Sequence, residues 1–448
     1  MAVDIVRRLR AASYTAYFAG GCVRDELLGL HPTDYDVATD APPQRITEIF
    51  PRTAEVGASF GVVLVKSQGV SVEVATFRSD GPYSDRRRPD TVRFSDPQSD
   101  ALRRDFTINA LFLDPLETTD ADAGAGAGAG AGAAAGAAAG LGRVIDFVNG
   151  QADLRDRVLR AVGDPDQRLA EDHLRALRAV RFAARLSLTI DPATASALQR
   201  HARGLEGVSR ERIGEELRRM LLDSRRAHAL TLLQSLRLDA PVLQESNWTG
   251  QPTLVVALGD ARAAQGASFS TVLAAWALDR ELSTDLPAPF PSLNAARAKK
   301  NRLPSAIDLL VSRWRSALCL SNDESDQFGR TLRALASVEH SWGALGIAQK
   351  KRLASTQVFP ESMRILRARN LRLAAEVDSE VAALGATAGG LAPTPLVDGD
   401  LLVAQGFEPG PAFKAILERV YDAQLEGRVT NVAQALTVAF EAAQELGT

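Results

Sequence analysis

The stretch spanning residues 17–40 constrains the fold more than any other, because it joins a glycine pair to two closely spaced aspartates. Gly20 and Gly21 should follow a short strand and open a helix over residues 23–29. The free N–H groups at a helix start can bind phosphate, and the missing Cβ atoms let the phosphate come close. Arg24 then adds a fork of donors to the same group. The segment is therefore predicted to hold a phosphate.

Asp34 and Asp36 are expected on the next strand, over Thr33–Thr39, with both side chains on one face because strand residues alternate. Two carboxylates held together repel each other unless a cation lies between them, and hard oxygen ligands favour Mg²⁺. For the glycine pair alone or the aspartate pair alone, an ordinary surface loop is the better interpretation. Together they favour a metal-dependent phosphoryl or nucleotidyl transferase that binds Mg²⁺ through Asp34 and Asp36.

Composition narrows the class of protein. The chain has 448 residues, is 46% hydrophobic and carries a net charge of −3, so any RNA binding must use local basic patches. The 2 cysteines, Cys22 and Cys319, are too far apart in sequence to suggest a disulfide framework or a zinc site. No apolar run reaches membrane-spanning length, so we expect a cytoplasmic, reducing location and no membrane partner.

The residue pattern changes near position 150. Residues 1–150 alternate helix and strand signals, which predicts a head of mixed structure. Beyond it, Ala, Leu and Arg recur at helical spacing. We therefore expect a helical neck over residues 151–225, which carries the base-selecting helix described below, and a helical body and tail over residues 226–448.

A Gly/Ala-rich run over residues 121–142 interrupts the head. Such low-complexity sequence cannot bury a core. We expect it to be a flexible insertion in a loop between two strands, at Ala110–Leu113 and Arg143–Phe147.

Glu73 is the candidate for a third carboxylate. It lies in a β-branched run, Val70–Phe77, that is expected to form a hairpin with Gly61–Lys66. An acid inside an otherwise apolar strand is unfavourable without a partner. A solvent-facing residue of a half-buried strand is the alternative, while the catalytic interpretation has Glu73 hold a metal or accept a proton.

The segment 80–94 is polar, contains Gly and Pro, and includes three consecutive arginines at positions 86–88. This composition predicts a mobile loop. It is either a solvated charged loop or a loop that closes on a nucleotide or RNA.

The eight residues from Arg103 to Ala110 read RRDFTINA. Arg104 can neutralise triphosphate charge, and Asp105 can reach ribose hydroxyls or hold an arginine. Asn109 closes the motif and is predicted, with them, to bind the nucleotide. The alternative is a helix start with an aspartate cap and surface arginines.

A second motif begins with Asp172 and continues with Arg175, Arg178 and Arg181 on the polar side of a predicted helix. Exposed salt bridges at spacing three are the alternative. Cytosine and adenine both carry an exocyclic amine beside a ring-nitrogen acceptor. A carboxylate accepts from the amine and a guanidinium donates to the nitrogen, so Asp172 and Arg175 can select C and A without a nucleic-acid template. Arg178 and Arg181 then face the phosphates or brace Asp172.

These motifs resemble those of the class II tRNA nucleotidyltransferases and bacterial poly(A) polymerases, strongly over residues 17–220 and moderately over 396–430. The resemblance implies an α+β fold: a polymerase-β-like nucleotidyltransferase head, with a mixed sheet and helices, then an all-helical neck, body and tail. It also implies that Glu73 is the third acid of a two-metal site, since its segment ends in the family's Thr-Phe-Arg.

The resemblance implies an enzyme that adds C, C and A to tRNA 3′ ends from CTP and ATP. The loop at 80–94 resembles the flexible loop of enzymes that add the terminal A, and residues 57–61 lack the basic stretch usual in poly(A) polymerases. An A-adding enzyme or poly(A) polymerase of the same family stays open, as does a non-catalytic RNA-binding module. Clustered acids argue against a module that only binds RNA.

Overall fold

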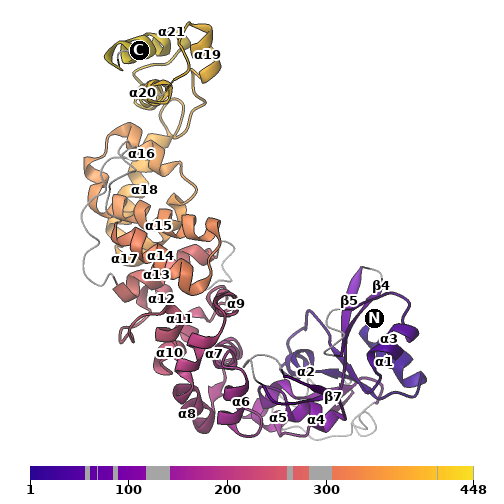
Figure 1. The fold of residues 1–448 in the computed structure, drawn as a ribbon. Coiled ribbons are helices and arrows are strands. Elements are labelled where there is room, and N and C mark those ends of the chain that lie inside the picture. The colour runs from indigo at the N-terminus through magenta and orange to yellow at the C-terminus, as the bar shows by residue number, and fades with distance from the viewer. Residues whose placement is uncertain are drawn as a thin grey trace, which may run out of the picture. The chain divides into compact units, whose positions relative to one another are not determined.

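The computed structural model describes residues 1–55, 61–67, 69–83, 89–117, 142–259, 266–281, 305–410 and 412–446 (Figure 1). The chain divides into two compact units, one made of residues 1–220 and 228–247 and the other of residues 221–227 and 248–448. All predicted site residues belong to the first unit. The insertion at 121–142 (apart from Gly142), the arginines at 86–88 and most of residues 57–61 lie outside the described residues.

The head is built on one mixed sheet, as predicted. Seven strands follow the order β3-β4-β5-β2-β1-β8-β9. Strands β2 and β5 run parallel and the other neighbours antiparallel. The elements of the head are α1 (Ala2–Ala11), β1 (Ala16–Ala19), α2 (Gly21–Leu27), β2 (Val37–Thr39), α3 (Pro43–Ile49), β3 (Thr53–Glu55), β4 (Val62–Ser67), β5 (Val70–Thr76), β6 (Arg78–Asp80), β7 (Val92–Phe94), α4 (Pro97–Leu102), the 3₁₀ turn η2 (Thr107–Asn109), β8 (Phe112–Asp114) and β9 (Arg143–Ile145).

The predicted hairpin is confirmed, since β4 and β5 pair from Val62↔Ala75 to Ser67↔Val70. The strands on either side of the insertion also pair with each other, because β8 and β9 are antiparallel neighbours. The strand expected over Thr33–Thr39 was predicted too long, because β2 begins at Val37. Its partner β1 ends at Ala19, where the chain turns into Gly20, so residues before Asp36 have no ladder to join.

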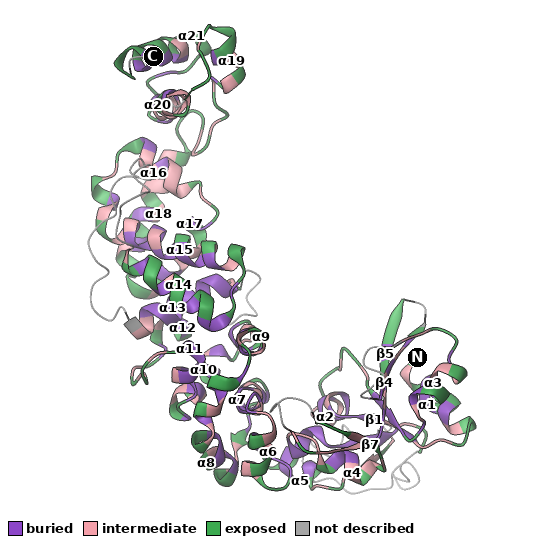
Figure 2. Cartoon of the chain, in the orientation of Figure 1, coloured by how far each residue is buried: buried purple, intermediate pink, exposed green. Residues whose placement is uncertain are grey.

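Aromatic side chains fill the centre of the head. The Phe77 side chain is fully buried, with its ring 6.2 Å from that of Tyr17 and 5.7 Å from that of Phe112. Strands β2 and β8 are buried along their whole length, and the burial colouring of Figure 2 shows the inner strands in purple. The sheet is therefore a rigid platform for the loops at its ends.

The neck is helical apart from one short parallel strand pair. The helix predicted to have a polar side also has an apolar one, because Leu174, Leu177, Val180 and Ala184 are all buried. The elements from here to the end of the first unit are α5 (Gly150–Arg155), β10 (Val158–Leu159), α6 (Pro165–Glu171), α7 (Arg175–Leu186), β11 (Thr189–Ile190), α8 (Pro192–Arg200), η4 (Ala202–Gly207), α9 (Arg210–Leu221), α10 (Arg226–Ser235) and α11 (Asp239–Leu243).

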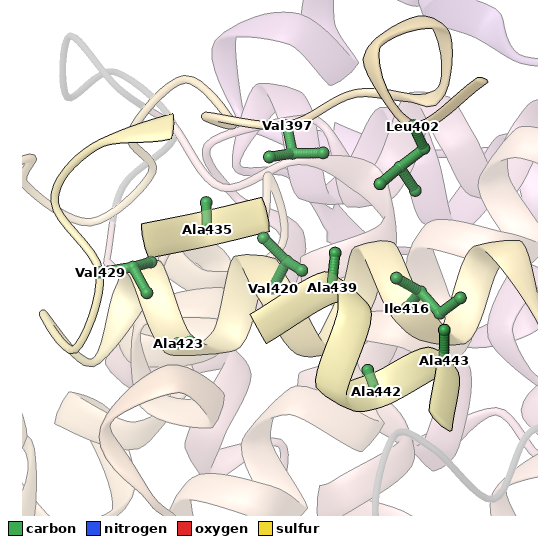
Figure 3. Close-up of a cluster of buried hydrophobic side chains, with 10 residues drawn as sticks. All are labelled: Val397, Leu402, Ile416, Val420, Ala423, Val429, Ala435, Ala439, Ala442 and Ala443. Atoms are coloured by element: carbon green, nitrogen blue, oxygen red, sulfur yellow. The ribbon is translucent and has the colours of Figure 1, made fainter. Parts of the chain in front are cut away.

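The remaining described elements are helices, namely α12 (Thr253–Ala257), α13 (Phe269–Glu281), α14 (Ala306–Leu318), α15 (Asn322–Ser341), η6 (Trp342–Ala344), α16 (Ile347–Ala354), α17 (Phe359–Arg369), α18 (Leu371–Gly385), α19 (Gly399–Ala404), α20 (Phe413–Leu425) and α21 (Val432–Leu446). The last three share an apolar cluster around Leu402, Ile416 and Val420 (Figure 3). The buried alanines of α21 let its backbone approach the cluster closely. Among the described residues, none of the helices has the length and apolar character needed to span a membrane.

We predict that Phe77→Ala destabilises the head by about 3–5 kcal/mol, because it leaves a cavity between two aromatic rings. The exposed Phe94 serves as a control, and its replacement by alanine should change the free energy of unfolding by less than about 1 kcal/mol. Urea unfolding followed by circular dichroism measures both. Equal effects of the two substitutions would contradict this account of the core.

Candidate nucleotide and metal site

Gly20 forms the turn between β1 and α2. Its φ is +76°, a conformation that side chains rarely adopt, and its N–H donates to the Leu111 carbonyl at 2.9 Å. A Cβ atom here would lie 2.8 Å from Nη1 of Arg104. The glycine therefore allows Arg104 to approach the turn. The neighbouring Gly21 starts α2, two residues earlier than predicted.

Arg24, predicted to contact phosphate, is buried within the protein. Its Nε donates to Asp25 Oδ1 at 2.8 Å, and its Nη1 donates to Asn109 Oδ1 at 2.6 Å. Burial lowers the pKa of Arg24, and the neighbouring Asp25 partly offsets that effect. In this structure Arg24 therefore organises neighbouring side chains, and its direct contact with a phosphate stays a prediction.

Asp105 links the head to the neck. Its carboxylate accepts from Arg178 Nε at 2.9 Å, from Asn109 Nδ2 at 3.1 Å and from the backbone N–H of Phe106 at 2.8 Å. Burial works to raise the pKa of Asp105, but Arg178 and Asn109 outweigh it and hold the pKa below its ordinary value. Of the alternatives left open by the sequence, the structure therefore has Asp105 hold an arginine.

Arg104 lies between the glycine turn and a buried acid that sequence reasoning missed. Its Nη2 donates to Asp100 Oδ2 at 2.9 Å and its Nη1 to the Asn109 carbonyl at 3.0 Å. Asp100 also holds Arg103, and the two arginines keep its pKa low despite burial. The sequence contained a signal, because Asp100 precedes these arginines by three and four residues, a spacing at which side chains meet along a helical turn.

Asp34 and Asp36 lie at the end of the loop before β2, and both are exposed to solvent. Glu73 lies on β5, next to β2 in the sheet, with its side chain exposed. Desolvation of the Asp36 carboxyl by the surrounding head, together with the charges of Glu73 and Asp34, raises its pKa to about 6, although Arg104 opposes the shift. The site thus concentrates negative charge that a cation would relieve.

The donor set fits a hard divalent cation that is completed by substrate oxygens. Among the described residues, no three His, Cys, Asp or Glu side chains gather closely enough to hold a metal by themselves. An ion such as Mg²⁺ commonly uses one or two carboxylates together with substrate phosphates, which matches the Asp34 and Asp36 pair. Whether Glu73 joins them as a third ligand stays a prediction.

Asp172 and Arg175 do not lie on successive turns of one helix. Asp172 caps the end of α6, whereas Arg175 begins α7. The Asp172 carboxylate is held by Arg212, whose Nη1 and Nη2 donate at 3.2 and 2.7 Å. Arg175 Nη1 donates to Glu171 at 2.5 Å and to the Arg168 carbonyl at 2.7 Å.

The sequence left Arg178 and Arg181 either to face the phosphates or to brace Asp172, and in the structure Arg212 is the residue that donates to the Asp172 carboxylate. Arg212 lies 40 residues further on, in α9. No spacing pattern marked this pair, since it joins two separate helices of the neck.

Three arginines surround the ring of Phe182 on α7. The guanidinium carbons of Arg24, Arg178 and Arg181 lie 5.1, 5.2 and 4.3 Å from the ring centre. Cation–π contacts of this kind offset part of the electrostatic repulsion between neighbouring guanidinium groups. The buried Glu216 also accepts from Arg181 Nε at 2.6 Å, and it is a second acid that the sequence motifs did not reveal.

Comparison with known proteins places the chain in a family. Residues 16–131 match the poly A polymerase head domain, and residues 187–247 match the probable RNA and SrmB-binding site of polymerase A. A CCA-adding enzyme of Limosilactobacillus fermentum is 32% identical over 436 residues, which cover 96% of this chain and 94% of that protein. The chain belongs to the family of CCA-adding enzymes.

Further CCA-adding enzymes are similar to this chain in sequence or in fold. That of Levilactobacillus brevis is 34% identical over 80% of this chain and 86% of its own length. The Bacillus stearothermophilus CCA-adding enzyme in complex with CTP has a TM-score of 0.70 and 26% identity, with 100% of this chain and 98% of that chain covered. The Thermotoga maritima CCA-adding enzyme complexed with tRNA shares the fold, with a TM-score of 0.62 at 17% identity.

For this member of the CCA-adding enzyme family, we predict that Asn109→Ala destabilises the first unit by about 2–3 kcal/mol. The change removes a hydrogen bond from each of two buried charges, Arg24 and Asp105. The matched control is Asn322→Ala, which removes an exposed contact with Arg315 and should change stability by less than about 0.5 kcal/mol. Urea unfolding measures both, and equal shifts would contradict the proposed burial of this network.

Proposed function

We propose that this chain is a tRNA nucleotidyltransferase that adds C, C and A to the 3′ ends of tRNA, using CTP and ATP. The observation that carries the proposal is the Asp105–Arg178 contact, because it ties the head, with its paired carboxylates, to α7, the helix that begins with Arg175. The names of the relatives agree with it. A cytoplasmic location, where tRNA is processed, is part of the proposal.

The carboxylates supply the chemistry at the phosphate. Asp34 and Asp36 hold Mg²⁺ in this proposal, and Glu73 holds it with them or accepts the proton of the attacking hydroxyl. A bound ion of this kind supplies Lewis-acid stabilisation of the reacting phosphate and lowers the pKa of a coordinated hydroxyl. The Asp36 pKa, raised by desolvation and by the charges of Glu73 and Asp34, agrees with the assignment, since a divalent cation would favour the ionised carboxylate.

Gly20, Gly21 and Arg104 bind the triphosphate. The turn leaves backbone free of Cβ atoms, and Arg104 lies against it while Asp100 fixes its guanidinium. Arg24 donates to Asn109, and Asn109 donates to Asp105, so both residues position this surface, while contact of Arg24 with a phosphate stays a prediction. The proposal therefore separates groups that touch phosphate from groups that position them.

Asp172 and Arg175 choose the base. Both oxygens of the Asp172 carboxylate accept hydrogen bonds from Arg212, and Oδ1 also accepts one from the Leu174 N–H. A carboxylate has about four acceptor positions, so one remains for an exocyclic amine. Arg175 donates to Glu171 and to the Arg168 carbonyl through Nη1, which leaves other donors of the guanidinium for a ring nitrogen. Uracil and guanine have a carbonyl in place of the amine and an N–H in place of the ring-nitrogen acceptor. Neither Asp172 nor Arg175 can therefore form its hydrogen bond with these bases.

The test is nucleotide incorporation into a tRNA transcript that lacks its 3′ CCA, with Mg²⁺ and with CTP, ATP or both. We predict two additions of C with CTP and one further A when ATP is present. Asp36→Ala should reduce the rate by about a thousandfold or more, because several kcal/mol of metal stabilisation is lost.

Other products would overturn the proposal in distinct ways. Addition of A only to a transcript ending in CC means an A-adding enzyme, and long A tails on unrelated RNA mean a poly(A) polymerase. Incorporation at background in both the parent and Asp36→Ala proteins means a non-catalytic RNA-binding module.

We further predict that Arg212→Ala lowers the preference for CTP and ATP over UTP and GTP by about tenfold, because Asp172 loses the partner that fixes its orientation. Arg200→Ala is the matched control, since Arg200 also contacts an aspartate, Asp166, through two nitrogens but at an exposed position. The ratio of kcat/KM values for the four nucleotides measures the preference. An unchanged ratio in Arg212→Ala would contradict the assigned role of Arg212.

A further inference from the structure

The two aspartates of the metal site stand on irregular backbone. Between the end of α2 at Leu27 and the start of β2 at Val37 there is no helix or strand. The Asp36 carbonyl accepts from the Ala19 N–H at 3.0 Å, which fixes the end of this segment against β1. The Asp34 side chain has a contact only with the adjacent Thr33 hydroxyl, at 3.3 Å, among the described residues. The sheet therefore does not by itself hold both carboxylates.

Tyr35, the residue between the two aspartates, makes the contacts that they lack. Its ring lies 5.1 Å from the ring of the buried Phe18 on β1. Its hydroxyl donates to Oε1 of Glu26, one residue before the end of α2. The side chain thus connects the irregular segment both to the sheet and to the helix that follows the glycine turn.

The contacts of Tyr35 oppose the electrostatic repulsion between the carboxylates of the site. Asp34, Asp36 and Glu73 carry like charges, and without a cation their repulsion favours movement of the exposed segment away from the sheet. Hydrogen bonds that end on a carboxylate are among the stronger ones in proteins, so the Tyr35–Glu26 contact is suited to resist that drift. Partners of this kind commonly set metal affinity without touching the metal.

We infer that Tyr35 and Glu26 are positioning residues that hold Asp34 and Asp36 in the arrangement that binds the divalent cation. The inference rests on the proposed function, because it takes the two aspartates as the ligands. Neither residue touches the cation or the nucleotide. They order the segment that carries Asp34 and Asp36 before the cation binds, which lowers the entropic cost of binding.

The test is Mn²⁺ binding to the full chain, followed by electron paramagnetic resonance without nucleotide or RNA. The parent should bind Mn²⁺, and Asp36→Ala should lose that binding. Tyr35→Phe, which removes only the hydroxyl, should weaken the affinity by about tenfold. Glu26→Ala should do the same, and the double variant should bind no more weakly than either single one, because both changes break one contact.

Two controls exclude general loosening of the head. Glu26→Gln keeps an oxygen that accepts from Tyr35 and should bind Mn²⁺ within about twofold of the parent. Tyr83→Phe removes a similar hydroxyl, which donates to Asp80 at 2.7 Å, and should leave Mn²⁺ affinity unchanged. In catalysis, Tyr35→Phe should raise the Mg²⁺ concentration for half-maximal rate by about tenfold and leave the rate at saturating Mg²⁺ within about twofold.

The outcomes separate this inference from the function on which it rests. Parent-like Mn²⁺ affinity in Tyr35→Phe, together with its loss in Asp36→Ala, overturns the inference and leaves the metal site standing. Equal Mn²⁺ binding by the parent and Asp36→Ala overturns the metal site, and the inference with it. A tenfold loss in Tyr83→Phe as well would show that any missing hydroxyl loosens the head, which also overturns the inference.

Discussion

The contact between Asp105 and Arg178 is the interaction on which the rest of the site depends. Asp105 belongs to the head and Arg178 to α7 of the neck, and the two side chains meet at 2.8 Å. A buried ion pair contributes little unless its remaining hydrogen-bonding positions are filled. Here Asn109 and a backbone N–H fill those of Asp105, and Asn109 in turn holds Arg24. These contacts therefore join residues of the head and of α7 in one network of hydrogen bonds.

Charge is separated within the first unit although the whole chain is nearly neutral. Desolvation, together with the charges of Glu73 and Asp34, raises the pKa of Asp36, while three arginines lie around the ring of Phe182. Ion pairs of Arg181 with Glu216 and of Arg178 with Asp105 reduce the repulsion between the arginines. This separation suits a substrate that combines a metal-bound triphosphate with a base that must be read by hydrogen bonds.

Much of this arrangement follows from local sequence. The β4–β5 hairpin and the buried stripe of α7 were predictable, because turn residues and side-chain period determine them within a few positions. The start of β2 was not, since it depends on where its partner β1 ends. Arg212 and Glu216 were missed for the same kind of reason, because each acts on a helix that is distant in sequence. The roles of the predicted site residues themselves stay predictions.

The central claim is that protein side chains, and no nucleic-acid template, choose the base. Equilibrium binding of CTP, ATP, UTP and GTP to the free chain, with Ca²⁺ in place of Mg²⁺ and without RNA, tests it most directly. The account predicts that CTP and ATP bind at least about tenfold more tightly than UTP and GTP, and that Asp172→Ala removes the difference. Equal binding of all four nucleotides to the parent protein would contradict it.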